Sequence, residues 1–434
     1  MKTAPSKIRA PRKTRRWLRP RVFVYAMLAA VAVGLIAAWV TSAFLATSVL
    51  RKAEADAIRK ALVEQAEALA IARTLADHPR GNRPIKFHRT FIDTLLPKTQ
   101  ATRTVARLLQ MDAALRAHDG DLDGALASCR AVVNCGRSLG DEPTLISQLV
   151  RMAVVGVGTH GAQRVLAQGE PSDAAMARVQ SLFADESTVP QTLFGMRGER
   201  GGMDELIRQI ASGELPVSAL SGYTEPPAGE KPPRESVSPW GRALFENSRA
   251  IMLEWMTDAV QISRKPDFEQ FPLWDAWDAR LREHGKLWHA GYTATFPLLL
   301  SPACQAAAKA QARNHAEQTA MSLMLAAERH RRKTGSWPRS ADDIDKAILA
   351  APLIDPFDGK PLRMEARDGK LFVYSIGFNF KDDHASYNIR KAMTGPHDVG
   401  GTLWDVAGRR RSPPMPNLPK NVFKTTPGQP FEKP

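Results

Sequence analysis

An uncharged stretch of sequence, Val22 to Leu50, constrains this chain more than any other feature. A helix needs about 20 apolar residues to cross the hydrocarbon core of a bilayer. This stretch exceeds that length, so it can span a membrane with some tilt. A cleaved signal peptide has an apolar core of only about 7–15 residues. The length therefore favours an uncleaved transmembrane anchor, while the small residues over 42–48 keep cleavage open as the alternative.

The charges that precede this stretch predict its orientation. The formal net charge of the chain is +15, and residues 1–21 contain nine Lys or Arg and no acid. Without those nine the net charge is only +6, so the basicity belongs to a short tail and does not indicate a nucleic-acid partner. Positive residues before a span hold the N-terminus in the cytoplasm. We expect a single-pass protein of the bacterial inner (cytoplasmic) membrane, with the lipid bilayer around 22–50 and the bulk of the chain in the periplasm.

Shifts in composition divide the remainder of the chain. The expected fold class is mainly α with a small α+β end, because apolar residues recur at helical spacing over most of the sequence. The segments that we predict are a basic cytoplasmic tail (1–21), a transmembrane helix (22–50), a helical domain (51–213), a Pro/Gly-rich linker or loop (214–240), an aromatic-rich helical segment (241–300), an α+β segment (301–406) and a disordered tail (407–434).

Several local patterns refine the helical part. The residues 104–141 are typical of a helical hairpin with a turn at His-Asp-Gly-Asp, and 142–169 is typical of a buried helix. The Arg- and Gly-rich run over 197–202 is expected to form a loop. Cys129 and Cys135 are six residues apart, a spacing that forbids a disulfide within one helix and favours two buried thiols. A bond from either of them to Cys304 stays open.

The C-terminal part has different patterning. An Ala-rich amphipathic helix over 303–335 is expected to stop at Gly335, and Ser340 is a candidate helix cap. Beyond it, two short apolar runs, 362–366 and 371–376, flank an Asp-Gly pair. That pair is the usual signal for a two-residue type I′ turn, so we predict a β-hairpin.

The residues of this region resemble those of a known family. The sequences ERHRRKTGSWPRSADDI (328–344), DPFDGKPLRM (355–364) and LFVYSIG (371–377) are similar to the globular end of the major pseudopilin of type II secretion. The resemblance covers about 315–406. Uncharacterised bacterial single-pass membrane proteins share the same layout of anchor, helical middle and pseudopilin-like end. Pseudopilins have a Glu just inside the apolar helix; because 22–50 has none and follows a long basic tail, we do not expect processing into a filament.

The resemblance also implies a metal site. In pseudopilins the loop after the Ser-x-Gly strand end binds calcium, and the matching residues here are Asn379, Asp382, Asp383 and Asp398. Calcium takes six to eight oxygen ligands, of which these side chains would supply some. Lys381 departs from the family pattern. The alternative is a solvated acidic loop with no cofactor.

The sequence contains no recognisable catalytic motif. A nucleophile elbow, a metalloprotease helix motif, a phosphate-binding loop and a dinucleotide fingerprint are all missing. Aromatic residues gather over 255–288, where core packing and a ligand groove are the two alternatives; they are Trp255, Phe268, Phe271, Trp274, Trp277 and Trp288. We therefore expect a binding or scaffold protein with a protein partner in the envelope. The alternatives are a hydrolase-like periplasmic enzyme with a groove around Trp274 and Trp288, and an accessory component of a secretion or envelope machine.

Overall fold

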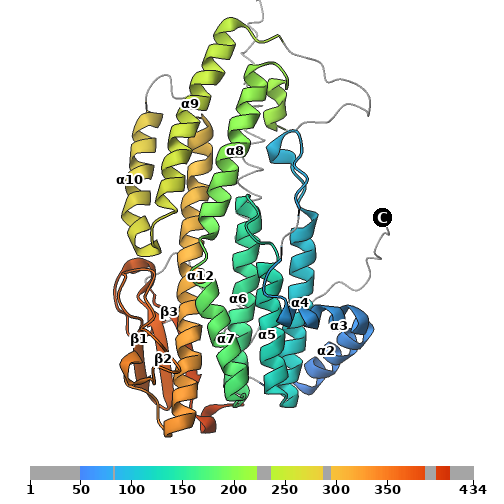
Figure 1. Ribbon diagram of the computed structural model, residues 1–434, viewed down its shortest axis with the longest axis vertical. Coiled ribbons are helices and arrows are strands. Elements are labelled where there is room, and N and C mark those ends of the chain that lie inside the picture. Colours follow the sequence, from blue (N-terminus) through green and yellow to red (C-terminus); the bar gives the residue numbers. More distant parts are fainter. Residues whose placement is uncertain (1–48, 82–83, 222–235, 287–294, 387–396, 411–434) are drawn as a thin grey trace, which may run out of the picture.

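A computed structural model describes residues 49–81, 84–221, 236–286, 295–386 and 397–410 of the chain. These residues form a mainly helical body with a small antiparallel sheet near the C-terminal end (Figure 1). The predicted transmembrane helix and basic tail lie outside the described residues, apart from the last two positions of the apolar stretch. Within the described ranges, no helix combines the length and the apolar character that a membrane crossing requires.

Long helices account for most of the body, and they run largely side by side (Figure 1). In chain order they are α2 (Lys52–Glu64), α3 (Ala66–Thr74), α4 (Pro97–Asp119), α5 (Leu122–Arg137), α6 (Leu145–Gln168), α7 (Asp173–Glu186), α8 (Gln191–Ala211), α9 (Pro239–Ile262), α10 (Asp267–Gly285) and α12 (Thr295–Thr334).

Local signals define the ends of several helices. Gly120 ends α4 in the left-handed region, with φ of 92°, and the Asp121 side chain then caps α5 by accepting from the Gly124 N–H at 2.9 Å. This confirms the predicted helical hairpin. Thr144 caps α6, a helix buried along most of its length as predicted, and Ser172 caps α7.

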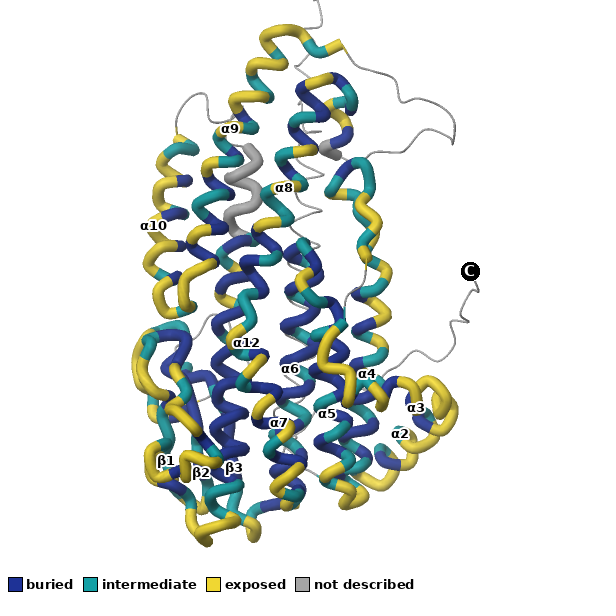
Figure 2. Tube along the Cα trace, viewed as in Figure 1, coloured by how far each residue is buried: buried dark blue, intermediate teal, exposed yellow. Residues whose placement is uncertain are grey.

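The longest helix, α12, lies at the centre of the molecule. Its 40 residues correspond to about 60 Å at the usual rise per residue. It packs against α6, α7, α9, α10 and the sheet, and Figure 2 shows that much of it is buried. Small side chains permit this close approach, since Ala316 and Ala320 are fully buried. The helix stops before Gly335, which has φ of 87°, as the sequence predicts.

Buried apolar residues form several clusters that share these helices. The first cluster contains residues of α4, α5, α6, α7, α12 and the sheet. The second contains residues of α8, α9, α10 and α12. The third packs α2 and α3 against α4, α5 and α6. Cys129, Cys135 and Cys304 are all buried, as predicted for the first two, and no disulfide joins any of them. Burial raises the pKa of the Cys129 thiol to about 12, so it is a neutral core group.

The sheet contains β1 (Arg363–Arg367), β2 (Lys370–Ser375) and β3 (Val399–Trp404) in the order β1-β2-β3. The first two strands form the predicted hairpin, with Arg367 opposite Lys370. Asp368 and Gly369 both have positive φ, of 51° and 67°, as a type I′ turn requires.

The third strand is not anticipated by the sequence analysis, and two glycines explain both its place and its weak signal. A Cβ at Gly400 would lie 2.1 Å from the Val373 carbonyl oxygen, and one at Gly401 would lie 2.6 Å from the Met324 sulfur. Glycine therefore lets β3 lie against both β2 and α12. Leu371, Val373 and Leu403 complete the contact with α12 as part of its buried core.

Asp355, in the turn before β1, ties this region together. Its carboxylate is fully buried and accepts from the Phe357 N–H at 2.8 Å, the Ser375 hydroxyl at 2.7 Å and the Ile376 N–H at 3.1 Å. Arg363 adds an ion pair at 2.7 Å. The Asp-Pro motif is therefore the structural link between the turn and the end of β2.

Two expectations need correction. The Arg- and Gly-rich run 197–202 lies inside α8 and is not a loop, because one face of that helix packs closely on other segments. Residues 407–410, placed in a disordered tail, are ordered, since Arg409 is buried against Glu328. The proposed linker 214–240 includes the short 3-10 helix Val217–Ser221 and the start of α9, while 222–235 lies outside the described residues.

Candidate functional site

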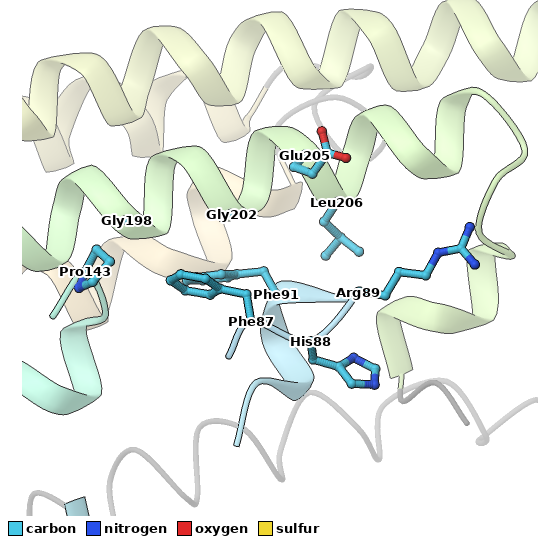
Figure 3. Close-up of a pocket in the computed structure, with 9 residues that line it drawn as sticks. All are labelled: Phe87, His88, Arg89, Phe91, Pro143, Gly198, Gly202, Glu205 and Leu206. Carbon is cyan, nitrogen blue, oxygen red and sulfur yellow. The ribbon is translucent and has the colours of Figure 1, made fainter. Parts of the chain in front are cut away.

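A hollow of about 250 Å³ lies between the segment 84–96 and α8. Figure 3 shows the rings of Phe87 and Phe91 lying beneath the α8 stretch that contains Gly198 and Gly202, with Leu206 nearby. Its lining is mostly apolar, and it consists of Phe87, His88, Arg89, Phe91, Pro143, Gly198, Gly202, Glu205 and Leu206.

Two glycines of α8 make this arrangement possible. A Cβ at Gly202 would lie 2.1 Å from the Phe91 ring, and a Cβ at Gly198 would lie 1.6 Å from the Pro143 carbonyl oxygen. The Phe91 ring in turn stacks on Phe87, with centroids 6.2 Å apart and planes inclined by 24°. The glycine face of the helix is therefore shaped to accept an aromatic pair.

A small polar network fixes the backbone of the same segment. Thr90 is fully buried, and its N–H donates to His88 Nδ1 at 3.1 Å while its hydroxyl donates to Asp93. Arg89 points away from the two rings (Figure 3) and donates to the Glu214 carbonyl oxygen at 3.1 Å. The polar groups thus hold the loop, which leaves the apolar side chains to face the hollow and the solvent.

Glu205, the acidic residue that lines the hollow, is already paired with a neighbouring side chain of α8. Glu205 makes a two-point contact with Arg208, at 2.8 Å for each pair of atoms, and this contact lowers the pKa of Glu205 to about 2. It stays ionised at neutral pH. The lining of the hollow is therefore suited to binding an apolar group.

A second hollow, of about 510 Å³, lies beside β1. It is lined by Arg339, Ser340, Ala341, Asp342, Pro352, Pro361, Leu362, Arg363, Met364, Glu365, Tyr374, Asp382 and His384. In contrast to the first hollow, most of its lining residues are polar or charged, and several of them belong to β1.

The four residues suggested as calcium ligands lie near this second hollow. The Asn379 amide donates to Asp383 at 2.7 Å, and the Asp383 N–H donates to Asp398 Oδ1 at 3.3 Å, so these three lie together. Asp382 instead accepts from the Tyr374 hydroxyl at 3.1 Å. Burial raises the pKa of Asp398 to about 6. Across the described ranges, no three His, Cys, Asp or Glu side chains are grouped as a metal centre would require.

The aromatic residues of 255–288 separate into two groups. Trp255, Trp274 and Trp277 are buried and pack edge to face, so for these three core packing is the alternative that holds. Phe271 stacks on Phe357, with centroids 5.2 Å apart, and joins α10 to the C-terminal region. Phe268 is partly exposed, and Trp288 lies outside the described residues.

Sequence analysis does not single out the segment 84–96. Its signal is the run Lys86 to Ile92, in which aromatic and basic residues are interleaved, but the partner glycines are more than a hundred residues away. No known protein family, curated protein sequence or solved structure matches this chain, so the site rests on its geometry alone.

Proposed function

We propose that this protein is a single-pass protein of the bacterial inner membrane whose periplasmic body binds and organises a partner protein of the envelope. The apolar stretch 22–50 and the basic tail support the anchor and its orientation. Leu50, at the end of that stretch, packs on the core of α2 to α6, and α2 begins at Lys52. The body would therefore sit close to the bilayer.

Exposed apolar side chains beside the first hollow are the observation that carries the binding role. Phe87 is 54% exposed, Ile92 41% and Leu95 83%, and all three belong to the segment 84–96. Large apolar groups gathered on a surface mark interaction sites. Burying one such side chain completely contributes about 1.5–3 kcal/mol.

The charges around this segment indicate the character of the partner. Lys86 and Arg89 lie within the segment and Lys98 follows it, whereas Asp93 is the one acid within it; Glu205, which lines the hollow, is paired with Arg208. An apolar segment in which basic residues outnumber acidic ones is complementary to an apolar partner segment flanked by acidic residues. We call residues 84–96 the docking segment.

Photocrosslinking in native membranes tests this proposal. With a photoreactive residue in place of Leu95, we expect discrete crosslinked products with a partner protein. A second probe in place of Val63, which is 70% exposed on α2, is the matched control and should not give these products. Introducing Phe87→Asp should abolish the Leu95 products because it places a charge in the apolar contact. Identical products from both probes would reject the docking segment.

The anchor is tested separately with reporters fused after Pro434. A reporter that works only in the periplasm should be active, and one that works only in the cytoplasm should be inactive. The opposite pattern, or recovery of the full chain without detergent, would refute the membrane anchor.

A further inference from the structure

The outer edge of β1 has no strand partner among the described residues. β1 is the first strand of the sheet, and its one neighbour is β2. The Leu362 N–H, just before it, donates outward to the Leu353 carbonyl oxygen at 2.9 Å, but that pairing ends in an isolated bridge between Ile354 and Pro361. Among the described residues, backbone pairing therefore covers the outer edge only just before β1 begins.

Strand geometry decides which backbone groups face outward. In an antiparallel pair, successive residues direct their N–H and C=O groups alternately toward and away from the partner strand. Arg367 and Lys370 flank the two-residue turn and form the first hydrogen-bonded pair, so Met364 and Ala366 face away from β2. No hydrogen bond to another described residue engages these backbone groups.

β1 is short and carries three charged side chains, but two other devices that block a sheet edge are missing from it. Proteins often protect such edges with a proline or a bulge. β1 contains no proline, and its register with β2 is unbroken from Arg363 to Arg367. Met364 lines the hollow of about 510 Å³, as do Arg339 to Asp342 and Pro352. An added strand would lie along this side of β1, at the usual spacing of about 4.8 Å.

The charge around this edge favours a basic occupant. The carboxylates of Asp342, Glu365 and Asp382 line the hollow, against the guanidinium groups of Arg339 and Arg363. Asp358 pairs with Arg363 and Arg367 pairs with Glu365, which adds one charge of each sign and leaves an excess of acid. The Tyr374 hydroxyl lies close to these acids. Burial, and then the nearby Asp382 and Glu365, raise its pKa.

We propose that β1 accepts a fourth strand, an extended basic peptide segment of a partner protein, along the outward backbone of Met364 and Ala366. Main-chain hydrogen bonds supply affinity in such strand addition, and alternate side chains supply specificity. This inference rests on the proposed binding role, but it uses a surface separate from the docking segment.

Fluorescence anisotropy with the full-length protein in non-ionic detergent tests it. The probe is a labelled peptide of alternating lysine and valine, and the matched probe alternates glutamate and valine. We expect the glutamate peptide to bind at least about tenfold more weakly because of the acidic hollow. Equal binding of the two peptides would overturn the proposal.

Variants of the edge sharpen the test. Ala366→Pro removes an outward N–H while leaving the hydrogen bonds to β2 intact, and it should weaken the lysine peptide about five- to tenfold. Asp382→Asn should weaken it and reduce its salt dependence. Bound lysine peptide should also slow amide hydrogen exchange over 363–367. Unchanged affinity in Ala366→Pro together with unchanged exchange would refute strand addition.

Two further measurements distinguish peptide binding at the edge of β1 from effects of the docking segment and of residues 411–434. Phe87→Asp should leave peptide binding unchanged. If the Leu95 probe gave no crosslinks in the protein without that substitution while the peptide still bound, the result would count against the docking segment alone. A chain shortened after Arg410 should bind the peptide as the full chain does. About tenfold tighter binding by the shortened chain would mean that residues 411–434 occupy the edge, and it would overturn the assignment to a partner protein.

Discussion

His315 shows how a single ionisable residue holds three helical segments together. It is buried on α12, where Nδ1 lies 2.5 Å from Asp267 Oδ2, and Nε2 lies 3.1 Å from the Val189 carbonyl oxygen and 3.0 Å from Gln191 Oε1. All of these neighbours are acceptors, an arrangement that favours a proton on each ring nitrogen and therefore the charged ring. Burial would lower the pKa of His315, but the Asp267 carboxylate and the hydrogen bonds raise it above its usual value.

Replacing this residue predicts a pH-dependent loss of stability. His315→Gln leaves the Asp267 carboxylate, whose side chain is only 10% exposed, without its charged partner. We therefore expect the free energy of unfolding near pH 6 to fall by about 3–5 kcal/mol. Because the folded-state pKa lies above the unfolded value of about 6.5, the contribution of the charged ring is full below that value. It is lost as the pH rises through the folded pKa.

Chemical denaturation of wild type and variant between pH 6 and alkaline pH measures this effect. The stability gap between them should narrow as the pH rises. His78→Gln, at an exposed histidine, is the matched control and should change little at any pH. A gap that stayed constant or widened toward alkaline pH would show that the ring acts by packing and not by charge.

At the scale of elements, α8 is the helix that most strongly contradicts its local sequence. Glycine disfavours a helix by about 1 kcal/mol per residue relative to alanine. Yet Gly195, Gly198 and Gly202 lie on the face that meets Leu145, Pro143 and Phe91. The contacts that stabilise this helix come from distant parts of the chain, which explains why local propensity predicts a loop.

A neighbouring pair of glycines provides a matched test of that account. A Cβ at Gly202 would meet the Phe91 ring, whereas a Cβ at Gly201 would meet nothing within 4 Å. We expect Gly201→Ala to stabilise the protein by up to about 1 kcal/mol. Gly202→Ala should displace the docking segment and destabilise it by about 1–3 kcal/mol.

Thermal unfolding and limited proteolysis distinguish the two variants. In Gly202→Ala, cleavage within 84–96 should become faster, while in Gly201→Ala it should match the wild type. Equal behaviour of the two variants would mean that close packing of Phe91 on α8 does not hold the segment in place.

Features that depend on local contacts could be predicted from the sequence, whereas features that depend on contacts between distant segments could not. The Asp368-Gly369 turn and the stop at Gly335 depend on the conformation of one or two residues, and both are confirmed. β3 and the hollow under Phe87 depend on glycines placed against distant segments, and neither is evident in the sequence. Of the suggested calcium ligands, Asn379, Asp383 and Asp398 lie together, whereas Asp382 turns toward Tyr374, a contact that the sequence pattern does not predict.

At the scale of the whole molecule, Arg409 joins the sheet to the helical body. Its guanidinium pairs with Glu328 of α12 at 2.8 Å and donates to the carbonyl oxygens of Gly169 at 2.8 Å and Trp404 at 2.9 Å. Both partners of the ion pair are almost completely buried. One side chain thus links the end of β3 to the ends of α6 and α12.

This link predicts where the chain can be shortened without loss of stability. A chain that ends after Arg410 should unfold at the same denaturant concentration as the full-length protein, since it retains the ion pair. A chain that ends after Gly408, like the variant Arg409→Ala, leaves Glu328 buried with only Arg331 beside it. We expect both to lose about 3–5 kcal/mol of unfolding free energy. Hydrogen exchange should then rise first over 399–404, because β3 loses its tether while the α4–α5–α6 core keeps its packing. Uniformly faster exchange through all helices would instead show that the sheet and the helical body unfold as one cooperative unit.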